Sequence, residues 1–305
     1  MPIPIILDCD PGTDDALAIL LALASPELNV LAITVAGGNV GLEITLPNAL
    51  ALVALAGARV PVHGGADNPL LGEFLPAHHI HADNGLGGVI LPPGPPPAPG
   101  IAADAIRDIL RGAPEPVTLV GIGPATNLAL ALATEPSLAV HVRDIVLMSG
   151  GWVRGNITPA AEFNAYSDPE ALAILLGTGH RVVFAALDLT DQALATPARL
   201  AVWRSLGPGR CLRAACDIQV AVPPSARLGG QGAPLHDPCV IAWLVRPDLF
   251  TAFPAHVSVD LAAGPDRGRT RLDRSGRTAD NALVLDTLDA DRFFALLGDR
   301  FASLP

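Results

Sequence analysis

Short apolar runs alternate with stretches of helical periodicity between residues 3 and 187. The apolar runs predict β-strands at residues 3–7, 30–35, 60–62, 117–122, 144–148 and 181–187. The stretches between them predict helices at residues 14–24, 45–56, 101–111, 125–133 and 169–176. Strands and helices that alternate in this order indicate βαβ units. We therefore expect an α/β fold with an open, mostly parallel sheet that is flanked by helices.

The composition does not change abruptly along the chain, so we expect one domain that spans residues 1–305. The proline-rich segment PPGPPPAPG at residues 92–100 predicts an extended surface loop. The arginine-rich segment at residues 264–277 predicts a solvated hairpin rather than an anion site. Neither segment is assigned a function.

The net charge is −11, and all 19 basic residues are arginine. An acidic chain argues against a protein that binds the phosphate backbone of nucleic acids, so no nucleic-acid partner is expected. No apolar run reaches the ~18 residues of a membrane-spanning helix, and the first residues do not resemble a signal peptide. These observations predict a cytoplasmic protein without a membrane partner. The four cysteines show no CxxC spacing and are expected to be buried thiols.

The candidate chemistry begins at residues 6–20, ILDCDPGTDDALAIL, where Asp8, Asp10, Asp14 and Asp15 lie between a predicted strand and a predicted helix. In open α/β sheets, ligands bind at the carboxyl ends of the strands. Acidic residues also favour a helix N-terminus, but that role accounts for only one or two of the four. Clustered carboxylates are typical ligands of a hard divalent cation, so the stretch predicts a Ca²⁺ or Mg²⁺ site.

One interpretation is a phosphatase of the haloacid dehalogenase type, whose first motif is DxDxT after a strand. The pair Asp8 and Asp10 approaches that motif. The threonine is displaced, however, because the sequence reads DCDPGT. The later basic and acidic residues of that family are not evident at suitable places.

The stretch DCDPGTDDALAILLAL more closely resembles the N-terminal signature of the nucleoside hydrolases, the inosine–uridine-preferring family. Further segments resemble the family in the same order: GGN (37–39), IHADNGLGG (80–88), TLVGIGPATNLALAL (118–132), VLMSGGWVRGNITPAAEFNAYSDPEA (146–171), LDLTDQALATP (187–197) and HDPC (236–239). The resemblance implies a nucleoside hydrolase fold, Rossmann-like, with the active site at the carboxyl ends of the strands. It also implies Ca²⁺-dependent hydrolysis of the N-glycosidic bond of ribonucleosides, to free base and ribose.

The resemblance also implies roles for individual residues. The Ca²⁺ ligands would be the carboxylates of Asp10, Asp15 and Asp237 and the backbone carbonyl of Ile122. Asp10 would be the general base and His236 the acid that assists departure of the base. The residues expected to bind substrate are Asp14, Asn39, His81, Met148, Asn156, Glu162, Asn164 and Asp237. Asp8 is expected to support the site from behind.

The chain departs from the family pattern at two places. Many members carry tyrosines before HDPC, whereas residues 217–235 of this chain contain none, and its single tyrosine is Tyr166. Ala82 replaces the glycine that commonly follows the histidine of the loop over the site. The base preference is therefore open, and a nucleoside-binding or ribose-binding protein with weak hydrolysis stays an alternative. Family members are commonly oligomers, so the resemblance implies a homodimer or homotetramer.

Overall fold

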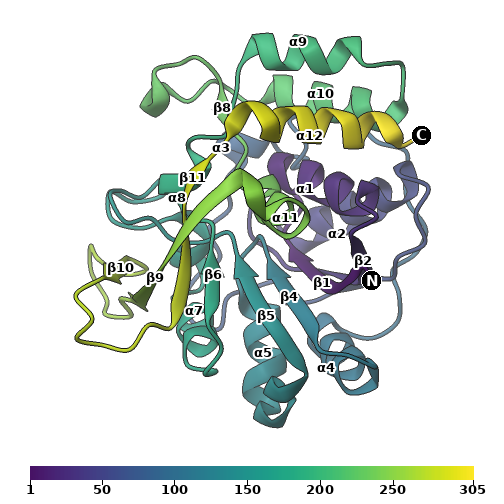
Figure 1. Ribbon diagram of the computed structural model, residues 1–305. Helices are drawn as coiled ribbons and strands as arrows, with labels where there is room; N and C mark the ends of the chain where they lie inside the picture. Colours follow the sequence, from purple (N-terminus) through teal and green to yellow (C-terminus); the bar gives the residue numbers. More distant parts are fainter.

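The computed structural model describes residues 1–305, apart from the side chain of His79, and these residues contain a nine-stranded sheet with helices on both faces (Figure 1). The strand order is β10-β9-β11-β6-β5-β4-β1-β2-β3. Pairing is parallel from β11 to β3, whereas β9 pairs antiparallel with both of its neighbours. The prediction of an α/β fold with a mostly parallel sheet is therefore confirmed.

The strands of this sheet are β1 (Ile3–Cys9), β2 (Leu28–Val35), β3 (Val62–Gly64), β4 (Val117–Gly121), β5 (Val142–Leu147), β6 (Val182–Phe184), β9 (Phe250–Val259), β10 (Thr270–Asp273) and β11 (Ala282–Leu288). A separate antiparallel pair is formed by β7 (Leu194–Ala195) and β8 (Ala233–Pro234).

The α-helices of the described chain are α1 (Thr13–Ala24), α2 (Leu42–Leu55), α3 (His78–His81), α4 (Ala102–Gly112), α5 (Thr126–Thr134), α6 (Phe163–Ser167), α7 (Pro169–Leu176), α8 (Leu187–Thr190), α9 (Pro197–Ser205), α10 (Arg210–Ala221), α11 (Pro238–Val245) and α12 (Ala290–Ser303). Three short 3₁₀ helices complete the fold: η1 (Pro136–His141), η2 (Ala226–Leu228) and η3 (Pro247–Leu249).

Alternating side chains of the strands supply two hydrophobic cores, one on each face of the sheet. In β1, Ile5, Leu7 and Cys9 point to the core under α1, α10, α11 and α12, whereas Ile6 points to the core under α4, α5 and α7. Successive residues of a strand face opposite sides of the sheet, so a strand covered on both faces is apolar throughout. This is why residues 3–7 form a continuous apolar run instead of an alternating pattern.

The eleven predicted elements are all present, with ends that shift by a few residues. The largest difference is at residues 181–187, where β6 spans only Val182–Phe184 and α8 begins at Leu187. Ala186 and Leu187 are nevertheless buried, and a short buried helix cannot be told from a strand by its apolar residues alone. In the arginine-rich segment, β10 pairs with β9, and Arg271 forms ion pairs with Asp260 and Asp266.

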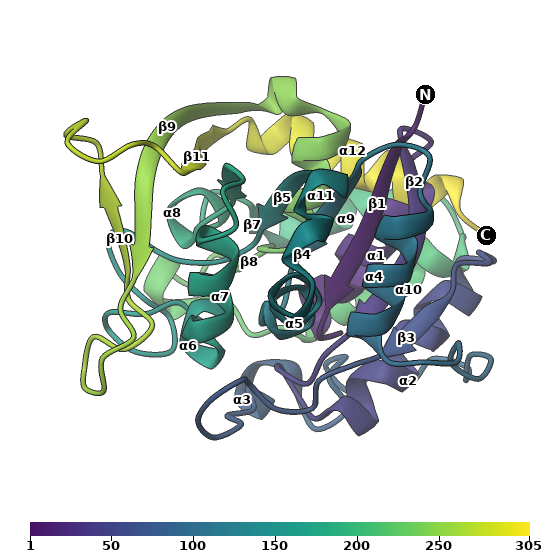
Figure 2. The same cartoon turned by 90° about the horizontal axis from the view of Figure 1, so that it is seen from below.

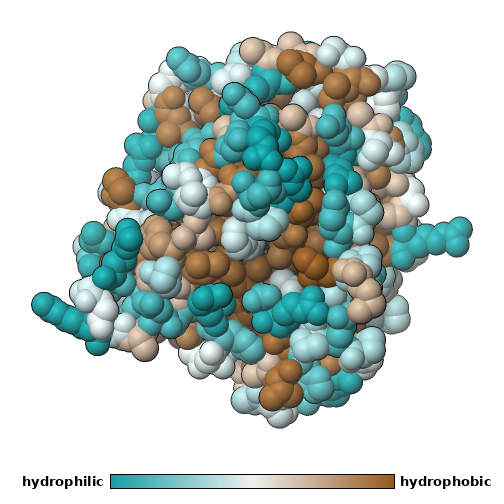
Figure 3. Space-filling view, viewed as in Figure 1, coloured by the Kyte–Doolittle hydropathy of each residue, from teal (hydrophilic) through white to brown (hydrophobic). Residues whose placement is uncertain are grey.

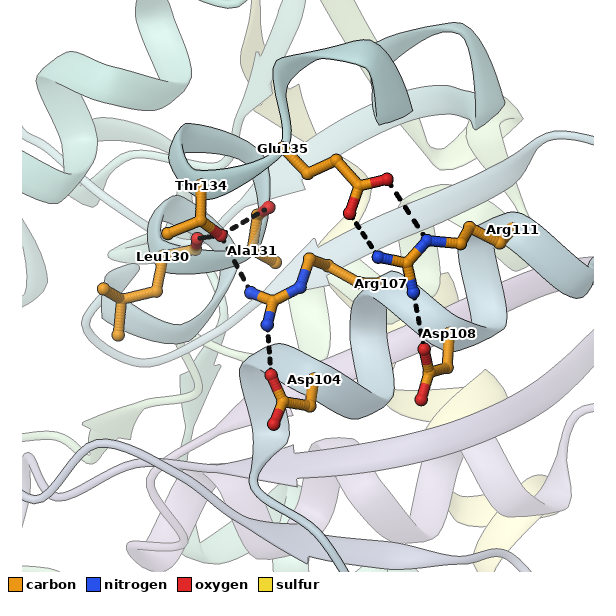
Figure 4. Close-up of polar contacts among 8 residues, drawn as sticks. All are labelled: Asp104, Arg107, Asp108, Arg111, Leu130, Ala131, Thr134 and Glu135. Carbon is orange, nitrogen blue, oxygen red and sulfur yellow. Dashed lines mark hydrogen bonds and ion pairs between the residues drawn. The ribbon is translucent and has the colours of Figure 1, made fainter.

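The helices α4 and α5 are joined at the surface by polar contacts (Figure 4). Arg111 pairs with Glu135 beyond the end of α5, and its guanidinium also lies 2.6 Å from a carboxylate oxygen of Asp108. Arg107 donates to the hydroxyl of Thr134 at 2.8 Å and pairs with Asp104. Exposed ion pairs of this kind stabilise a protein by roughly 0–1 kcal/mol each, so the buried cores carry most of the stability.

The strands β9 and β10 extend to one side of the molecule, opposite to α1, α2 and the two chain termini (Figures 1 and 2). In the space-filling view, apolar residues are visible in the middle of one face and hydrophilic residues surround them (Figure 3). Apolar atoms contribute much of the surface of any folded protein, so this band by itself indicates no site. None of the described helices combines the length and the apolar character needed to cross a membrane.

Candidate active site

The carboxyl ends of the parallel strands meet at a cavity of about 280 Å³. All eight substrate-binding residues predicted from the sequence line it, together with the predicted acid and the predicted carbonyl ligand: Asp14, Asn39, His81, Ile122, Met148, Asn156, Glu162, Asn164, His236 and Asp237. Asp10 and Asp15 are fully buried and are not part of the lining. The fold thus brings segments from both ends of the chain to one cavity.

Asp10 follows β1 directly, and its carboxylate is enclosed by backbone. Its Oδ2 accepts from the backbone N–H of Asn39 at 2.7 Å, whereas its Oδ1 is buried and has no hydrogen-bond partner within the described part of the chain. A Cβ added to Gly38 would lie 2.1 Å from Oδ2, and a Cβ added to Gly123 would lie 2.3 Å from Oδ1. Positions 38 and 123 therefore need glycine, because any side chain there would clash with the carboxylate of Asp10.

Asp15 lies in the first turn of α1 and closes that turn onto β1. Its carboxylate accepts from the backbone N–H groups of Asp10 and Gly12, both at 3.0 Å. The side-chain amide of Asn39 donates to the same carboxylate at 2.9 Å. These contacts fix Asp15 next to Asp10 instead of letting the two side chains move apart.

Burial and mutual repulsion disfavour the charged forms of these acids. Burial, together with the charge of Asp15, raises the pKa of Asp10 well above its usual value. The pKa of Asp15 is raised to about 6, mainly by burial and then by the charge of Asp14. The pKa of Asp237 is raised well above its usual value by burial and by the charges of Asp14, Asp15 and Asp10. A cation among these groups would relieve the repulsion.

The donor set fits a hard divalent cation. Asp14, Asp15 and Asp237 each offer a carboxylate oxygen, and these atoms lie within 4.8 Å of one another. All are oxygen donors with negative charge, which is what Ca²⁺ and Mg²⁺ prefer. Two of these residues, Asp15 and Asp237, belong to the ligand set predicted from the sequence, whereas Asp14 was predicted to contact ribose. The cluster could therefore hold a metal ion.

Ile122 follows β4, and its carbonyl is adjacent to the cavity. The side-chain amide of Asn164 donates to the carbonyl of Ile122 at 2.9 Å and to that of Met148 at 3.1 Å. Both contacts use the amide nitrogen of Asn164. Its amide oxygen, Oδ1, is therefore left to accept a hydrogen bond from a ligand. A carbonyl oxygen has two lone pairs, so Ile122 can still accept a second contact.

Glu162 is the N-cap of α6 and is almost completely buried. Its carboxylate accepts from the backbone N–H groups of Gly150, Asn164 and Ala165, at 2.8–2.9 Å. Burial raises its pKa to about 7, although these hydrogen bonds act in the opposite direction. The neighbouring Asn156 accepts from the backbone N–H of Phe163 at 2.8 Å, which directs its amide nitrogen away from that contact.

His81 reaches the cavity from α3, on the loop that follows β3. Its Nδ1 lies 3.0 Å from the backbone nitrogen of Thr13 and 3.0 Å from the hydroxyl of Thr13. Because a backbone N–H can only donate, Nδ1 is an acceptor, and the proton of the neutral ring lies on Nε2. Ala82 follows with φ 59° and ψ −179°, a conformation that glycine adopts far more readily than alanine.

His236 lies at the other end of the cavity, next to α8. The hydroxyl of Thr190 lies 2.7 Å from its Nδ1. Burial lowers the pKa of His236. Asp191, which follows Thr190 in the chain, forms a bidentate ion pair with Arg227, with N···O distances of 2.5 and 2.6 Å.

Several cavity residues were not predicted from the sequence: Thr13, Phe163, Gln219, Ser225 and Arg227. Gln219 belongs to α10, and Ser225 and Arg227 follow it in the segment rich in proline and glycine. A signal was present, since Arg227 is the only charged residue between Asp217 and Asp237. A lone arginine in a loop is more often a solvated residue, and only its position in the fold indicates otherwise.

Asp8 lies on β1 below the cavity. Its Oδ1 accepts from the hydroxyl of Thr34 at 2.6 Å and from the side-chain amide of Asn127 at 2.9 Å. The carbonyl oxygen of that amide accepts from the backbone N–H of Ala66 at 2.8 Å. Asp8 does not line the cavity, and it connects β1 to β2 and α5.

Comparison with known proteins assigns the chain to one class. Residues 5–295 match the family model described as inosine-uridine preferring nucleoside hydrolase. The chain is 42% identical to a pyrimidine-specific ribonucleoside hydrolase RihA of Salmonella gallinarum, over 98% of both chains. It is 41% identical to the protein of that name from Klebsiella pneumoniae, over 99% of both chains. The chain therefore belongs to the inosine-uridine preferring nucleoside hydrolase family.

Solved structures agree with this assignment. A purine-preferring ribonucleoside hydrolase from Gardnerella vaginalis matches with a TM-score of 0.90 and 33% identity, over 98% of both chains. A plant nucleoside hydrolase matches with a TM-score of 0.92 and 31% identity, over 99% of both chains. This protein is thus a ribonucleoside hydrolase, which is an N-glycosidase. The assignment replaces the phosphatase interpretation.

Proposed function

We propose that this protein hydrolyses pyrimidine ribonucleosides with a Ca²⁺ ion bound by its aspartates. The observation that carries the proposal is the position of the carboxylate cluster beside a cavity whose lining includes amides, acids and two histidines. The pyrimidine preference is supported by the curated relatives named above, at 41–42% identity over almost the whole chain. The relative with the purine preference is less similar, at 33% identity.

The ion would be held by Asp10, Asp15 and Asp237 and by the carbonyl of Ile122. Asp14 lies close enough to Asp15 and Asp237 to share their cluster. A bound divalent cation offsets the repulsion among these carboxylates and lowers the pKa of water. Ca²⁺ accepts a larger and less regular set of oxygen ligands than Mg²⁺, which suits donors from three separate segments.

Asp10 is the proposed general base. Its Oδ2 is held by Asn39, and its Oδ1 has no hydrogen bond to the described residues, so Oδ1 can accept a proton from the attacking water. The water oxygen then bonds to C1′ of the ribose as the C1′–N bond breaks, and the base leaves with the electron pair. The transition state resembles an oxocarbenium ion, as in glycoside hydrolysis generally.

The ribose would bind between Asp14, Asn164 and the loop that carries Asn156 and Glu162. Asp14 lines the cavity and is an acceptor for the 2′-hydroxyl, and Asn164 offers Oδ1 on the same side. Asn156 and Glu162 would hold the 5′-hydroxyl. Acids and amides that face sugar hydroxyls reject deoxyribose, because a missing hydroxyl leaves them without a partner.

The base would occupy the part of the cavity between His236 and the segment that follows α10. Gln219, Ser225 and Arg227 add an amide, a hydroxyl and a guanidinium there. These groups match the carbonyl oxygens of a pyrimidine, on which negative charge develops as the base departs. His236 is the proposed acid on this side.

A substrate panel tests the proposal. Purified protein with Ca²⁺ is incubated separately with uridine, cytidine, inosine, adenosine, guanosine and 2′-deoxyuridine, and free ribose or deoxyribose is measured. We expect release from uridine and cytidine to exceed release from the purine nucleosides, with little from 2′-deoxyuridine. Release of no sugar from any nucleoside, with nucleoside binding retained, would support the binding-protein alternative instead. A preference for the purine nucleosides would overturn only the base assignment.

A further inference from the structure

The segment that follows β6 contacts the base side of the cavity, although none of its residues has yet been given a part in the reaction. It contains α8 and Asp191, and it belongs to the stretch LDLTDQALATP. Thr190, the last residue of α8, contacts His236, and Asp191 contacts Arg227. Two consecutive residues thus reach two groups that line the cavity.

The contact between Thr190 and His236 determines which ring nitrogen carries the proton. Thr190 is fully buried, and its contact with Nδ1 of His236 is the one hydrogen bond that its hydroxyl makes among the residues the structure describes. If Nδ1 carried the proton, the hydroxyl could only accept, and its own proton would be buried without an acceptor. The hydroxyl therefore donates to Nδ1, and the neutral ring carries its proton on Nε2.

The same contact fixes the direction of the ring. Because Nδ1 faces α8 and His236 lines the cavity, Nε2 is the ring nitrogen left for a ligand. The backbone N–H of Thr190 bonds to the carbonyl of Ala186 at 3.0 Å, which holds its backbone in the helix. The branched side chain of threonine has few χ1 rotamers, so its hydroxyl has a defined direction.

We propose that Thr190 is a positioning residue, which keeps His236 in the Nε2–H form with that N–H directed at the departing base. The inference rests on the proposed function for the role of His236, but the hydrogen bond and the tautomer do not depend on it. A hydrogen bond to an oxygen or nitrogen of the base strengthens as negative charge develops there. Thr190 thus contributes to catalysis without touching the substrate.

Kinetics of three variants test the role in catalysis. Thr190→Val keeps the shape but removes the hydroxyl, and Thr190→Ser keeps the hydroxyl. Thr178→Val is the matched control, since the hydroxyl of Thr178 bonds to the carbonyl of Leu175 at the far end of α7. With uridine and Ca²⁺, we expect Thr190→Val to lower kcat by about 5- to 100-fold, the range for a lost hydrogen bond to a buried group. Thr190→Ser should recover most of this loss, and Thr178→Val should be unchanged.

Nitrogen NMR of the protein with ¹⁵N-labelled histidine measures the tautomer directly. The signal of His236 is assigned by its loss in His236→Asn, and the two ring nitrogens are distinguished by their couplings to the ring protons. We expect the Nε2–H form in the wild-type protein and in Thr190→Ser. In Thr190→Val, we expect a mixture of the two neutral forms. The wild-type spectrum is informative even if Thr190→Val does not fold.

Either of two results would overturn the proposal. One is a wild-type protein with the proton on Nδ1, and the other is a Thr190→Val variant with unchanged tautomer and unchanged kcat. A wild-type protein that hydrolyses no ribonucleoside would refute the proposed function instead, and the spectrum would still decide whether Thr190 sets the tautomer. The two failures are therefore distinguishable.

Discussion

The backbone N–H of Asn39 donates to Oδ2 of Asp10 at 2.7 Å, while Oδ1 of the same carboxylate has no partner among the described residues. One oxygen is thus held in place, and the other is buried with its lone pairs unused. This arrangement suits a base, because a carboxylate that accepts a proton must be oriented without using all of its lone pairs.

Asp10→Asn should lower turnover by about 10²–10⁴-fold, since the amide cannot accept the proton of the attacking water. The carbonyl of the asparagine can still accept from Asn39, so binding of ribose should change little. Because Asp10 is also a proposed ligand of the ion, steady-state release of ribose and calorimetry with ribose measure the two effects at saturating Ca²⁺. Near-normal turnover in this variant would remove Asp10 as the base.

Removal of divalent cations with EDTA should abolish turnover, and Ca²⁺ should restore it. Binding should also stabilise the fold, by about 2.7 kcal/mol at a Ca²⁺ concentration of 100 times Kd. Thermal unfolding with and without Ca²⁺ measures this gain. Asp237→Asn should lose the gain, and Asp266→Asn, in the exposed loop before β10, should keep it. An equal gain in both variants would contradict the assigned site.

Glu162 should make the protein less stable as the pH rises. Its pKa of about 7 in the folded protein lies above its usual value of 4.5, so the folded state binds more protons between these values. Protonation of Glu162 in the folded state thus adds about 3 kcal/mol to the free energy of unfolding. This contribution is complete below about pH 4 and is lost by about pH 8.

Urea unfolding at pH 4 and pH 8 tests this effect. Glu162→Gln resembles the protonated form, so its stability relative to the wild-type protein should rise by about 3 kcal/mol between the two pH values. Glu115→Gln, at a surface ion pair with Arg143, is the control. A constant difference between Glu162→Gln and wild type would show that Glu162 has no raised pKa.

Asp191→Asn should lower kcat/KM for uridine by about tenfold. The bidentate ion pair with Asp191 orients the guanidinium of Arg227 in the cavity, and asparagine cannot form that pair. Arg227→Lys should not preserve activity, since an ammonium group cannot form the same paired contact. Arg143→Gln breaks an exposed ion pair elsewhere and serves as the control. Full activity in Asp191→Asn would mean that the pair has no role in catalysis.

Ala82→Gly should stabilise the protein by about 1 kcal/mol. The φ of 59° and ψ of −179° cost alanine roughly 1–3 kcal/mol, and the greater freedom of glycine in the unfolded chain offsets part of the gain. Ala113→Gly, at an ordinary φ of −68°, should be neutral or destabilising. Chemical denaturation measures both variants, and a less stable Ala82→Gly would argue against backbone strain at this residue.

The sequence predicts the parallel strands from β1 to β6 well, because β1, β4 and β5 are covered on both faces and therefore appear as continuous apolar runs, but it does not predict β11, which pairs in parallel with β6. It does not predict β9, whose residues face a core and the solvent alternately and include Pro254. Most of the predicted site residues come from segments beside strand ends, and these meet at one cavity.

Thr190 and Arg227 could not be predicted as parts of the site in the same way. Their significance lies in contacts with His236 and Asp191, which are 46 and 36 residues away in the chain. A threonine in an apolar segment has no local pattern that indicates a function, and the one signal for Arg227, its isolation among uncharged residues, equally fits a solvated loop residue. The strained backbone at Ala82 is likewise visible only in its dihedral angles, although the alanine itself departs from the family pattern.

The order of segments around the cavity has a consequence for synthesis. Asp15 and Asp237 are 222 positions apart, and β11, which pairs with both β6 and β9, follows at residues 282–288. On the ribosome, the first acids therefore emerge long before their partner, and β6 and β9 have open edges until the last strand is made. Assembly of the carboxylate cluster therefore needs the chain beyond residue 237, and a chain that ends before β11 leaves the edges of β6 and β9 exposed.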